Sequence, residues 1–192
     1  MSVRDKRKAE TLSLIHTVAQ RAALDKGLVD MKVDEVAEEV GISRRTFFNY
    51  YSTKEDAVLG LRPPVLTDES IERFKSSQED ILSRIVWLVV DVIRTTTVPG
   101  SSGGMRKKLR GQFPELVHRF DVRSRASEEI IRNALLDNLE KTNLILSKED
   151  IEILLGLARV IIKHAYTIDS EIKDDSIKQS INNYKTTIRK TI

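Results

Sequence analysis

The sequence predicts an all-α chain divided into two domains, residues 1–62 and residues 63–192. Apolar residues recur every three or four positions in most segments, which is the pattern of helices that bury one face. Pro63 and Pro64 interrupt this pattern, because proline lacks the N–H group that continues a helix. No segment offers strand partners for a sheet, so both domains are expected to be helical.

A long helix that ends near Gly27 is the first expected element. Leu12, Ile15, Ala19 and Ala22 are spaced to form its buried face. The residues before this face are rich in positive charge and are expected to form an N-terminal arm for phosphate or minor-groove contact, carried by Arg4, Lys6, Arg7 and Lys8.

Two short helices joined by a tight turn are expected between Val33 and Tyr51. Val33, Val36, Ala37 and Val40 form the apolar face of the first helix. Gly41 suits the left-handed position that ends a helix, and Ile42 can fill the corner beside it. Ser43 is a preferred N-cap for a second helix over residues 44–51.

The second helix has an aromatic inner face and a polar outer face. Phe47 and Tyr51 are four residues apart and are expected to face the first helix. Arg44, Arg45 and Asn49 are left on the outside. Arginine can donate two hydrogen bonds to guanine, and asparagine can pair with adenine, so this face has the chemistry to read base edges in the major groove. Lys54 follows the helix and is predicted to neutralise a phosphate. The segment is therefore predicted to be a helix-turn-helix DNA reader; the alternative is an ordinary helical hairpin with a solvated basic face.

The same residues resemble the tetracycline-repressor (TetR) family over about a third of the chain. The resemblance is carried by Val36-Ala37, Gly41-Ile42-Ser43, the run from Thr46 to Tyr51, and Thr53-Lys54-Glu55. Two positions depart from the family pattern: Phe48 replaces a tyrosine and Lys32 replaces a threonine, both of which commonly contact phosphate in the family. The DNA-contacting residues that the motif and the resemblance together indicate are Lys32, Ser43, Arg44, Arg45, Thr46, Asn49, Tyr50 and Lys54.

Beyond the reader, a connecting helix is expected over residues 54–61, followed by the proline pair. The segment 81–92 is apolar on nearly every side, and a buried helix is preferred over a strand. Residues 99–104 are rich in glycine and serine and are predicted to form a loop, with a short basic helix over 105–109 behind it.

Three longer helices are expected in the remainder of the chain. The first starts at Pro114 and runs toward Lys141, with Leu139 on its apolar side. The second opens at Ser147 with a capping box completed by Asp150. The last covers residues 174–191.

The resemblance also implies a dimer formed by the last two helices and a small-molecule pocket in the larger domain. The alternative for these helices is packing within their own domain. The expected dimer contacts are Leu154, Ala158, Ile161, Ala165, Ile177, Ile181, Tyr184 and Ile188. The expected pocket residues are Arg84, Trp87, Asp91, Met105, Phe113 and Phe120, although a salt-bridged surface beside a core tryptophan is a competing interpretation of the first three.

Composition limits the other functions that are open to the chain. Of its 192 residues, 32% are charged, and the net charge is +3. The chain has no cysteine, which excludes disulfides and cysteine-based metal or redox sites. The first residues are charged rather than apolar, and no segment is long enough to cross a bilayer, so no membrane association is expected and a cytoplasmic location is predicted. His16, His118 and His164 share no ligand spacing, so neither a metal, a cofactor nor enzymatic activity is expected.

Together, these features predict a homodimeric, sequence-specific transcriptional regulator. It is expected to act as a repressor that leaves a palindromic double-stranded DNA operator when an unidentified small-molecule effector binds. An architectural or cell-division DNA-binding protein on the same scaffold and a helical protein-interaction module remain the alternatives.

Overall fold

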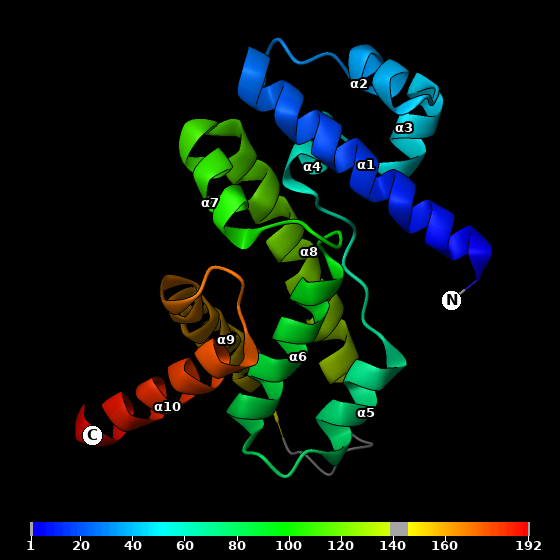
Figure 1. Cartoon of the computed structure of the whole chain (residues 1–192). Helices are drawn as coiled ribbons and strands as arrows, with labels where there is room; N and C mark the ends of the chain where they lie inside the picture. The colour runs from blue at the N-terminus through cyan, green and yellow to red at the C-terminus, as the bar shows by residue number, and fades with distance from the viewer. Residues whose placement is uncertain (1, 139–145, 192) are drawn as a thin grey trace. The chain divides into compact units, whose positions relative to one another are not determined.

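The computed structural model describes residues 2–138 and 146–191, and every regular element in these ranges is a helix (Figure 1). The all-α prediction is thus confirmed. The chain forms two compact units: Met1–Pro63 with Thr96–Arg123, and Pro64–Thr95 with Ser124–Ile192, here called the first and second units. Within the described residues, no helix is both long and apolar enough to span a membrane.

The first unit is built around its N-terminal helix. α1 (Val3–Lys26) packs against α2 (Val33–Val40) and α4 (Lys54–Leu59), and α3 (Arg44–Tyr50) packs against α2 (Figure 1). The second segment of this unit contains α7 (Gly103–Gln112) and the first residues of α8 (Glu115–Asn138). One core joins these elements, and its most buried members include Ile15, Ala19, Val36, Phe47, Leu59, Leu109 and Leu116.

The basic residues near the N-terminus do not form a separate arm as predicted, because they belong to the first turns of α1. Ser2 and Asp5 form a capping box that starts this helix: Ser2 Oγ accepts a hydrogen bond from the Asp5 amide at 3.2 Å, and Asp5 Oδ2 accepts one from the Ser2 amide at 3.1 Å. Arg4, Lys6, Arg7 and Lys8 therefore project from a helix and are all exposed.

The domain division differs from the predicted cut between residues 62 and 63. The chain does leave the first unit at Pro63, but it returns at Thr96. The Arg62 amide donates to the Thr96 carbonyl at 2.7 Å, and the Val98 amide donates to the Gly60 carbonyl at 3.0 Å. These bonds join segments that are distant in the sequence, so residues 96–123 pack with the N-terminal helices rather than with the larger bundle.

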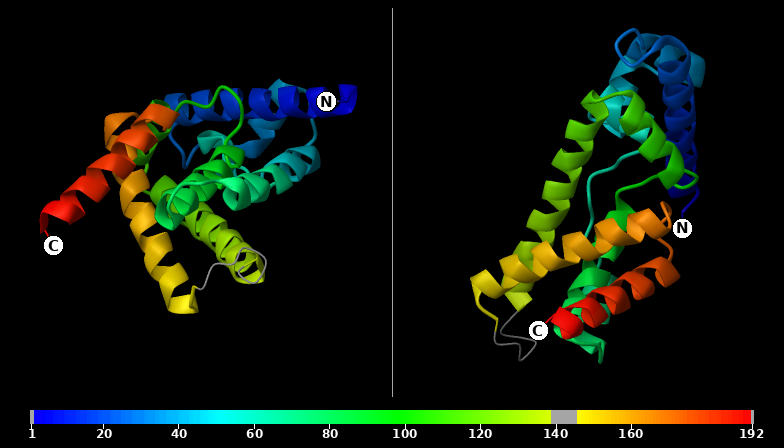
Figure 2. Two further views of the ribbon diagram at one scale, coloured as in Figure 1. Left: turned by 90° about the horizontal axis from the view of Figure 1, so that it is seen from below. Right: turned by 90° about the vertical axis from the view of Figure 1, so that its left-hand side faces the viewer.

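The second unit is a bundle around one apolar helix. α6 (Ile81–Thr95) packs against α5 (Asp68–Ser76) and α9 (Lys148–Ile168), and α10 (Asp174–Thr191) packs against α9. Figure 2 shows α9 and α10 as a pair joined by a short turn. The residues of α8 from Ser124 onward complete the unit, whose most buried residues include Ile85, Val86, Leu88, Ile131, Ile151, Ala158, Ile161 and Ile177.

Most of the predicted later elements are confirmed. Residues 81–92 are helical rather than extended, the Ser147–Asp150 capping box opens α9, and α10 has the predicted bounds. α5 was not predicted. The predicted loop is shorter than expected, because Ser102 caps α7 and Gly103 and Gly104 form its first turn. α8 is described to Asn138, so the predicted extension through Leu139 to Lys141 lies outside the described residues.

Candidate nucleic-acid interface

The turn between α2 and α3 has the geometry that its residues predict. Gly41 adopts φ 77° and ψ 33°, the left-handed conformation that a residue with a Cβ rarely takes, and its amide bonds back to α2. The Ile42 amide donates to the Ala37 carbonyl at 2.9 Å, and the Ile42 side chain packs against the core. Ser43 Oγ accepts from the Thr46 amide at 3.0 Å and so starts α3. These contacts fix the angle at which α3 leaves α2.

The inner face of α3 is anchored by two aromatic side chains. Phe47 is 0% exposed and Tyr51 is 1% exposed, and their ring centroids are 6.3 Å apart. The Tyr51 hydroxyl donates to the Leu12 carbonyl of α1 at 3.0 Å. Burial raises the pKa of Tyr51, so this phenol keeps its proton and remains a donor. α3 is thus held on α1 by both packing and a buried hydrogen bond.

The outer face of α3 presents the predicted polar set to solvent. Arg44, Arg45 and Asn49 are exposed. Thr46 and Tyr50 are only partly exposed: the Thr46 hydroxyl lies 2.8 Å from Ser43 Oγ, and the Tyr50 ring packs against the core. The structure therefore brings the side chains of Arg44, Arg45 and Asn49, which can hydrogen-bond to base edges, together on one exposed surface. Thr46 and Tyr50 lie at the edge of this surface.

Ser43 and Lys32 are both exposed, but they differ in whether their side-chain polar group already interacts within the protein. The Ser43 hydroxyl is used in capping α3. Lys32 precedes α2 and forms no ion pair with any residue that the structure describes. Lys32 therefore has an ammonium group available for a phosphate, which fits its predicted role.

Two acidic side chains of α2 are paired with cations of α1. Arg21 of α1 forms an ion pair with Glu39, and Lys26 forms one with Glu35 at 2.6 Å. The Lys26 ammonium lowers the pKa of Glu35 through a hydrogen bond and through charge attraction. The pairs offset part of the repulsion that the carboxylates of α2 would exert on a nucleic-acid backbone.

Lys54 has a different position from the one its sequence context suggests. Its ammonium donates to three carbonyls of the connection between α1 and α2: Leu28 at 2.6 Å, Val29 at 3.2 Å and Met31 at 3.2 Å. An ammonium group has three protons, and these bonds occupy all of them. The geometry does not support the predicted phosphate contact; Lys54 instead fixes the turn that leads into α2.

Replacing Lys54 with Met tests this structural role. We expect the free energy of unfolding to fall by about 1 to 2 kcal/mol, because three carbonyls lose a charged donor. Affinity for DNA should fall without a change in its salt dependence. For Lys32→Met, by contrast, we expect unchanged stability and a salt slope reduced by about one phosphate contact. Unchanged stability of Lys54→Met with a reduced salt slope would restore the phosphate assignment.

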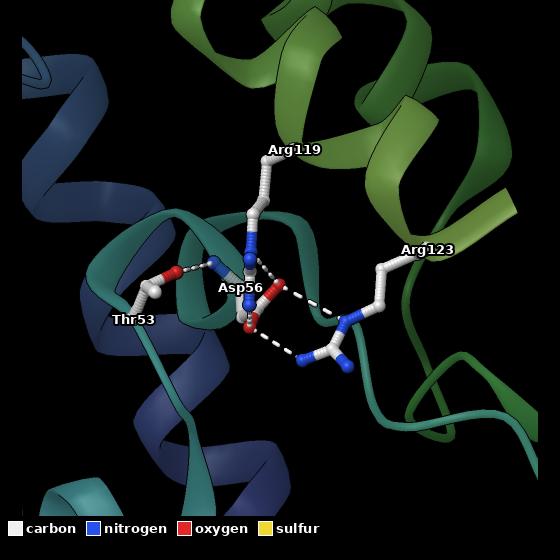
Figure 3. Close-up of polar contacts among 4 residues, drawn as sticks. All are labelled: Thr53, Asp56, Arg119 and Arg123. Atoms are coloured by element: carbon white, nitrogen blue, oxygen red, sulfur yellow. Dashed lines mark hydrogen bonds and ion pairs between the residues drawn. The ribbon is translucent and has the colours of Figure 1, made fainter. Parts of the chain in front are cut away.

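A buried ion cluster supports α4, the helix that follows the reader. Asp56 is 0% exposed and accepts four hydrogen bonds from two arginines of α8 (Figure 3). Arg119 donates at 2.8 Å and 2.5 Å, and Arg123 donates at 3.3 Å and 2.6 Å. Thr53 Oγ1 caps the same helix by accepting from the Asp56 amide at 3.1 Å. The sequence does not predict this cluster, because no local pattern links Asp56 to arginines more than sixty positions away.

The predicted pocket residues are divided between the two units. Arg84 and Trp87 line a surface cavity of about 230 Å³ in the second unit, together with residues of α5 and α10 that include Arg73, Asp174 and Lys178. Asp91 does not line this cavity and forms an ion pair with Arg73. The other three predicted residues belong to the first unit and pack against its core: Met105, Phe113 and Phe120. These three residues do not line the cavity of the second unit, and their role as pocket walls stays a prediction.

The predicted dimer residues also need correction. Five of them are buried in the core of the second unit, and a partner cannot contact them without rearrangement: Ala158, Ile161, Ala165, Ile177 and Ile181. Leu154 and Tyr184 are partly buried against the same core, and Ile188 is 38% exposed. The helical spacing located the apolar face correctly but did not reveal that this face packs inside the protomer.

The three histidines do not form a common site. His16 is buried in the first unit, and its Nδ1 lies 2.8 Å from the Ala57 carbonyl. Burial lowers the pKa of His16, so the neutral ring donates this bond. His164 Nδ1 lies 2.9 Å from Ser180 Oγ in the second unit, and His118 is exposed on α8. Each histidine has separate surroundings.

Comparison with known proteins gives a match to a family model. Residues 15–59 match the profile of the bacterial regulatory proteins of the tetR family. A search of curated proteins found no match to the chain. The matched segment contains the second half of α1 and all of α2, α3 and α4, which is the part of the structure that builds and supports the exposed face of α3. Residues 15–59 are therefore similar to the helix-turn-helix segment of bacterial regulatory proteins of the tetR family, which supports a role in DNA binding and transcription regulation.

Proposed function

We propose that this protein is a transcriptional repressor of the tetR family that binds a palindromic operator as a homodimer and releases it when a small molecule binds. The observation that carries the proposal is the exposed face of α3, on which Arg44, Arg45 and Asn49 project from a helix anchored by Phe47 and Tyr51. Rigid support of exposed base-reading groups favours sequence-specific reading over general adhesion to DNA. Such a protein acts where the genome is, in the cytoplasm of a bacterium.

Exposed apolar side chains on α9 support the dimer. Ile153 is 61% exposed, Val160 is 58% exposed and Ile168 is 41% exposed, and their spacing of seven and eight residues places them on one side of the helix. Ile188 adds an exposed apolar group on α10. Burial against a second copy would remove this surface from water, and two copies would present two readers to half-sites about 34 Å apart.

Placing a charge among the exposed apolar side chains of α9 should prevent dimer formation. For Val160→Glu we expect a monomer by sedimentation velocity at a concentration where the parent chain is a dimer, because the carboxylate cannot be buried without a partner. Val65→Glu, at a position that is 50% exposed outside α9, is the matched control and should leave the dimer intact. A dimeric Val160→Glu variant would place the interface elsewhere.

The cavity lined by Arg84 and Trp87 supports the effector part of the proposal. An effector can release DNA only if it binds the DNA-free conformation more tightly than the DNA-bound one. Trp87 is the single tryptophan of the chain, so its fluorescence reports directly on compounds that enter the cavity. A compound that changes this emission and also lowers DNA affinity would support the proposal, whereas an emission change without release would contradict it.

In vitro selection from a library of random duplexes tests the DNA-binding part. The proposal predicts enrichment of an inverted repeat whose half-sites are about one helical turn apart. An architectural DNA-binding protein would retain many duplexes without a common sequence. A protein-interaction module would retain duplex only weakly and without preference. Either of these two results would refute operator recognition.

A further inference from the structure

Arg44 is held in place by two side chains, whereas its neighbour Arg45 is not. Arg44 Nη1 donates to Asp34 Oδ2 of α2 at 2.7 Å. The central carbon of the same guanidinium lies 5.5 Å from the centroid of the Phe48 ring, four residues further along α3. Arg45 is exposed, and among residues 2–138 and 146–191 it forms neither an ion pair nor a ring contact. The two adjacent arginines therefore differ in how far they are ordered before DNA binds.

This difference affects how well each side chain can select a base. A long side chain that becomes ordered only on binding loses rotamer entropy at that moment, and one that is already held loses less. The guanidinium of Arg44 has five N–H groups, and the bond to Asp34 uses one of them. The remaining groups suffice for the two hydrogen bonds that guanine O6 and N7 accept.

The Phe48 ring restricts the orientation of the guanidinium plane of Arg44. A ring below a guanidinium favours a defined orientation of its plane, and a two-pronged bond to a base edge requires the guanidinium plane to align with the base. Phe48 is itself held edge-on to the buried Phe47, with centroids 5.4 Å apart and planes at 80°. The chain of contacts from the core through Phe48 to Arg44 is thus continuous.

We propose that Asp34 and Phe48 are positioning residues that orient Arg44 to read a specific base, and that Arg44 rather than Arg45 carries the base preference at that position. This inference rests on the sequence-specific DNA binding proposed above. It also assigns a purpose to a carboxylate that is 65% exposed beside a DNA-reading surface, where an unpaired negative charge would only repel phosphates.

Base preference measured on single variants tests the proposal. The duplex enriched by the parent chain, and a scrambled version of it, serve as probes for the full-length protein. Asp34→Asn should lower affinity for the enriched duplex about three- to tenfold and leave the scrambled duplex unchanged, and selection should show a flattened preference at the same base position as Arg44→Ala. The double variant Asp34→Asn with Arg44→Ala should lose no more base preference than Arg44→Ala alone. Asp34→Glu should recover part of the preference.

Glu38→Gln is the matched control for charge. It removes one exposed carboxylate from the same helix, and Glu38 forms no ion pair within the described residues. This variant should retain the full base preference. Phe48→Leu should flatten the preference at the Arg44 position without unfolding the first unit, which thermal denaturation can verify.

Three results would overturn the inference. Tighter binding of Asp34→Asn to both duplexes would mean that Asp34 acts only by repelling phosphates. An unchanged base preference in Asp34→Asn, or a flattened preference in Arg45→Ala but not in Arg44→Ala, would remove the positioning role. If the parent chain enriches no sequence at all, the proposed operator recognition itself fails, and this outcome is separate from the other three.

Discussion

Asp56→Ala should lower the free energy of unfolding by about 3 to 5 kcal/mol, the range for breaking a buried ion pair from one side. The variant leaves the side chains of Arg119 and Arg123, only 21% and 14% exposed, without their shared acceptor. Two like charges would then face each other in a site poorly reached by water. Urea denaturation followed by circular dichroism measures the loss.

Two further variants make this prediction specific. Glu72→Ala breaks the exposed pair with Lys75 on α5 and should change stability by less than about 1 kcal/mol. Asp56→Leu combined with Arg119→Met and Arg123→Met removes all three charges, and we expect it to recover much of the stability. If Asp56→Ala were as stable as Glu72→Ala, the cluster would not support α4.

Phe47→Ala should be comparably destabilising, at about 3 to 5 kcal/mol, because it empties a fully buried site at the centre of the first unit. Since Phe47 anchors α3, affinity for the preferred duplex should fall, and the difference in affinity between this duplex and a scrambled one should shrink. Urea denaturation and duplex titrations on the same variant measure both effects.

The adjacent Phe48 is the natural comparison for this variant. Phe48 is 42% exposed, so Phe48→Ala should cost about 1 kcal/mol or less in stability. Its effect should instead be seen in base preference. A stable Phe47→Ala variant with normal DNA binding would show that α3 does not depend on this anchor.

The parts of the structure that the sequence predicts are those governed by neighbouring residues. Gly41 and Ser43 determine the end of one helix and the start of the next through backbone conformation and a side-chain cap, and both effects act within a few residues. The same applies to the capping box at Ser147. For this reason the reader, with its inner and outer faces, was predictable in detail.

The features that sequence analysis missed depend on contacts between distant segments. Lys54 lies beside three carbonyls only because α1 and α2 are joined by a turn that folds over it. The pairing of Asp56 with α8, and the return of the chain at Thr96, likewise require the assembled first unit. Helical spacing also cannot distinguish an apolar face that packs inside a protomer from one that meets a partner, which explains the error for Ala158 and Ile161.

The most direct test of the account is the binding of the purified full-length chain to fluorescent duplexes across a salt series. One duplex carries the DNA upstream of its own gene, and the other is a scrambled version of that sequence. We predict tight, salt-sensitive binding with a preference of about 10³ or more for the first duplex. Equal and weak binding to both duplexes would contradict regulation from this site.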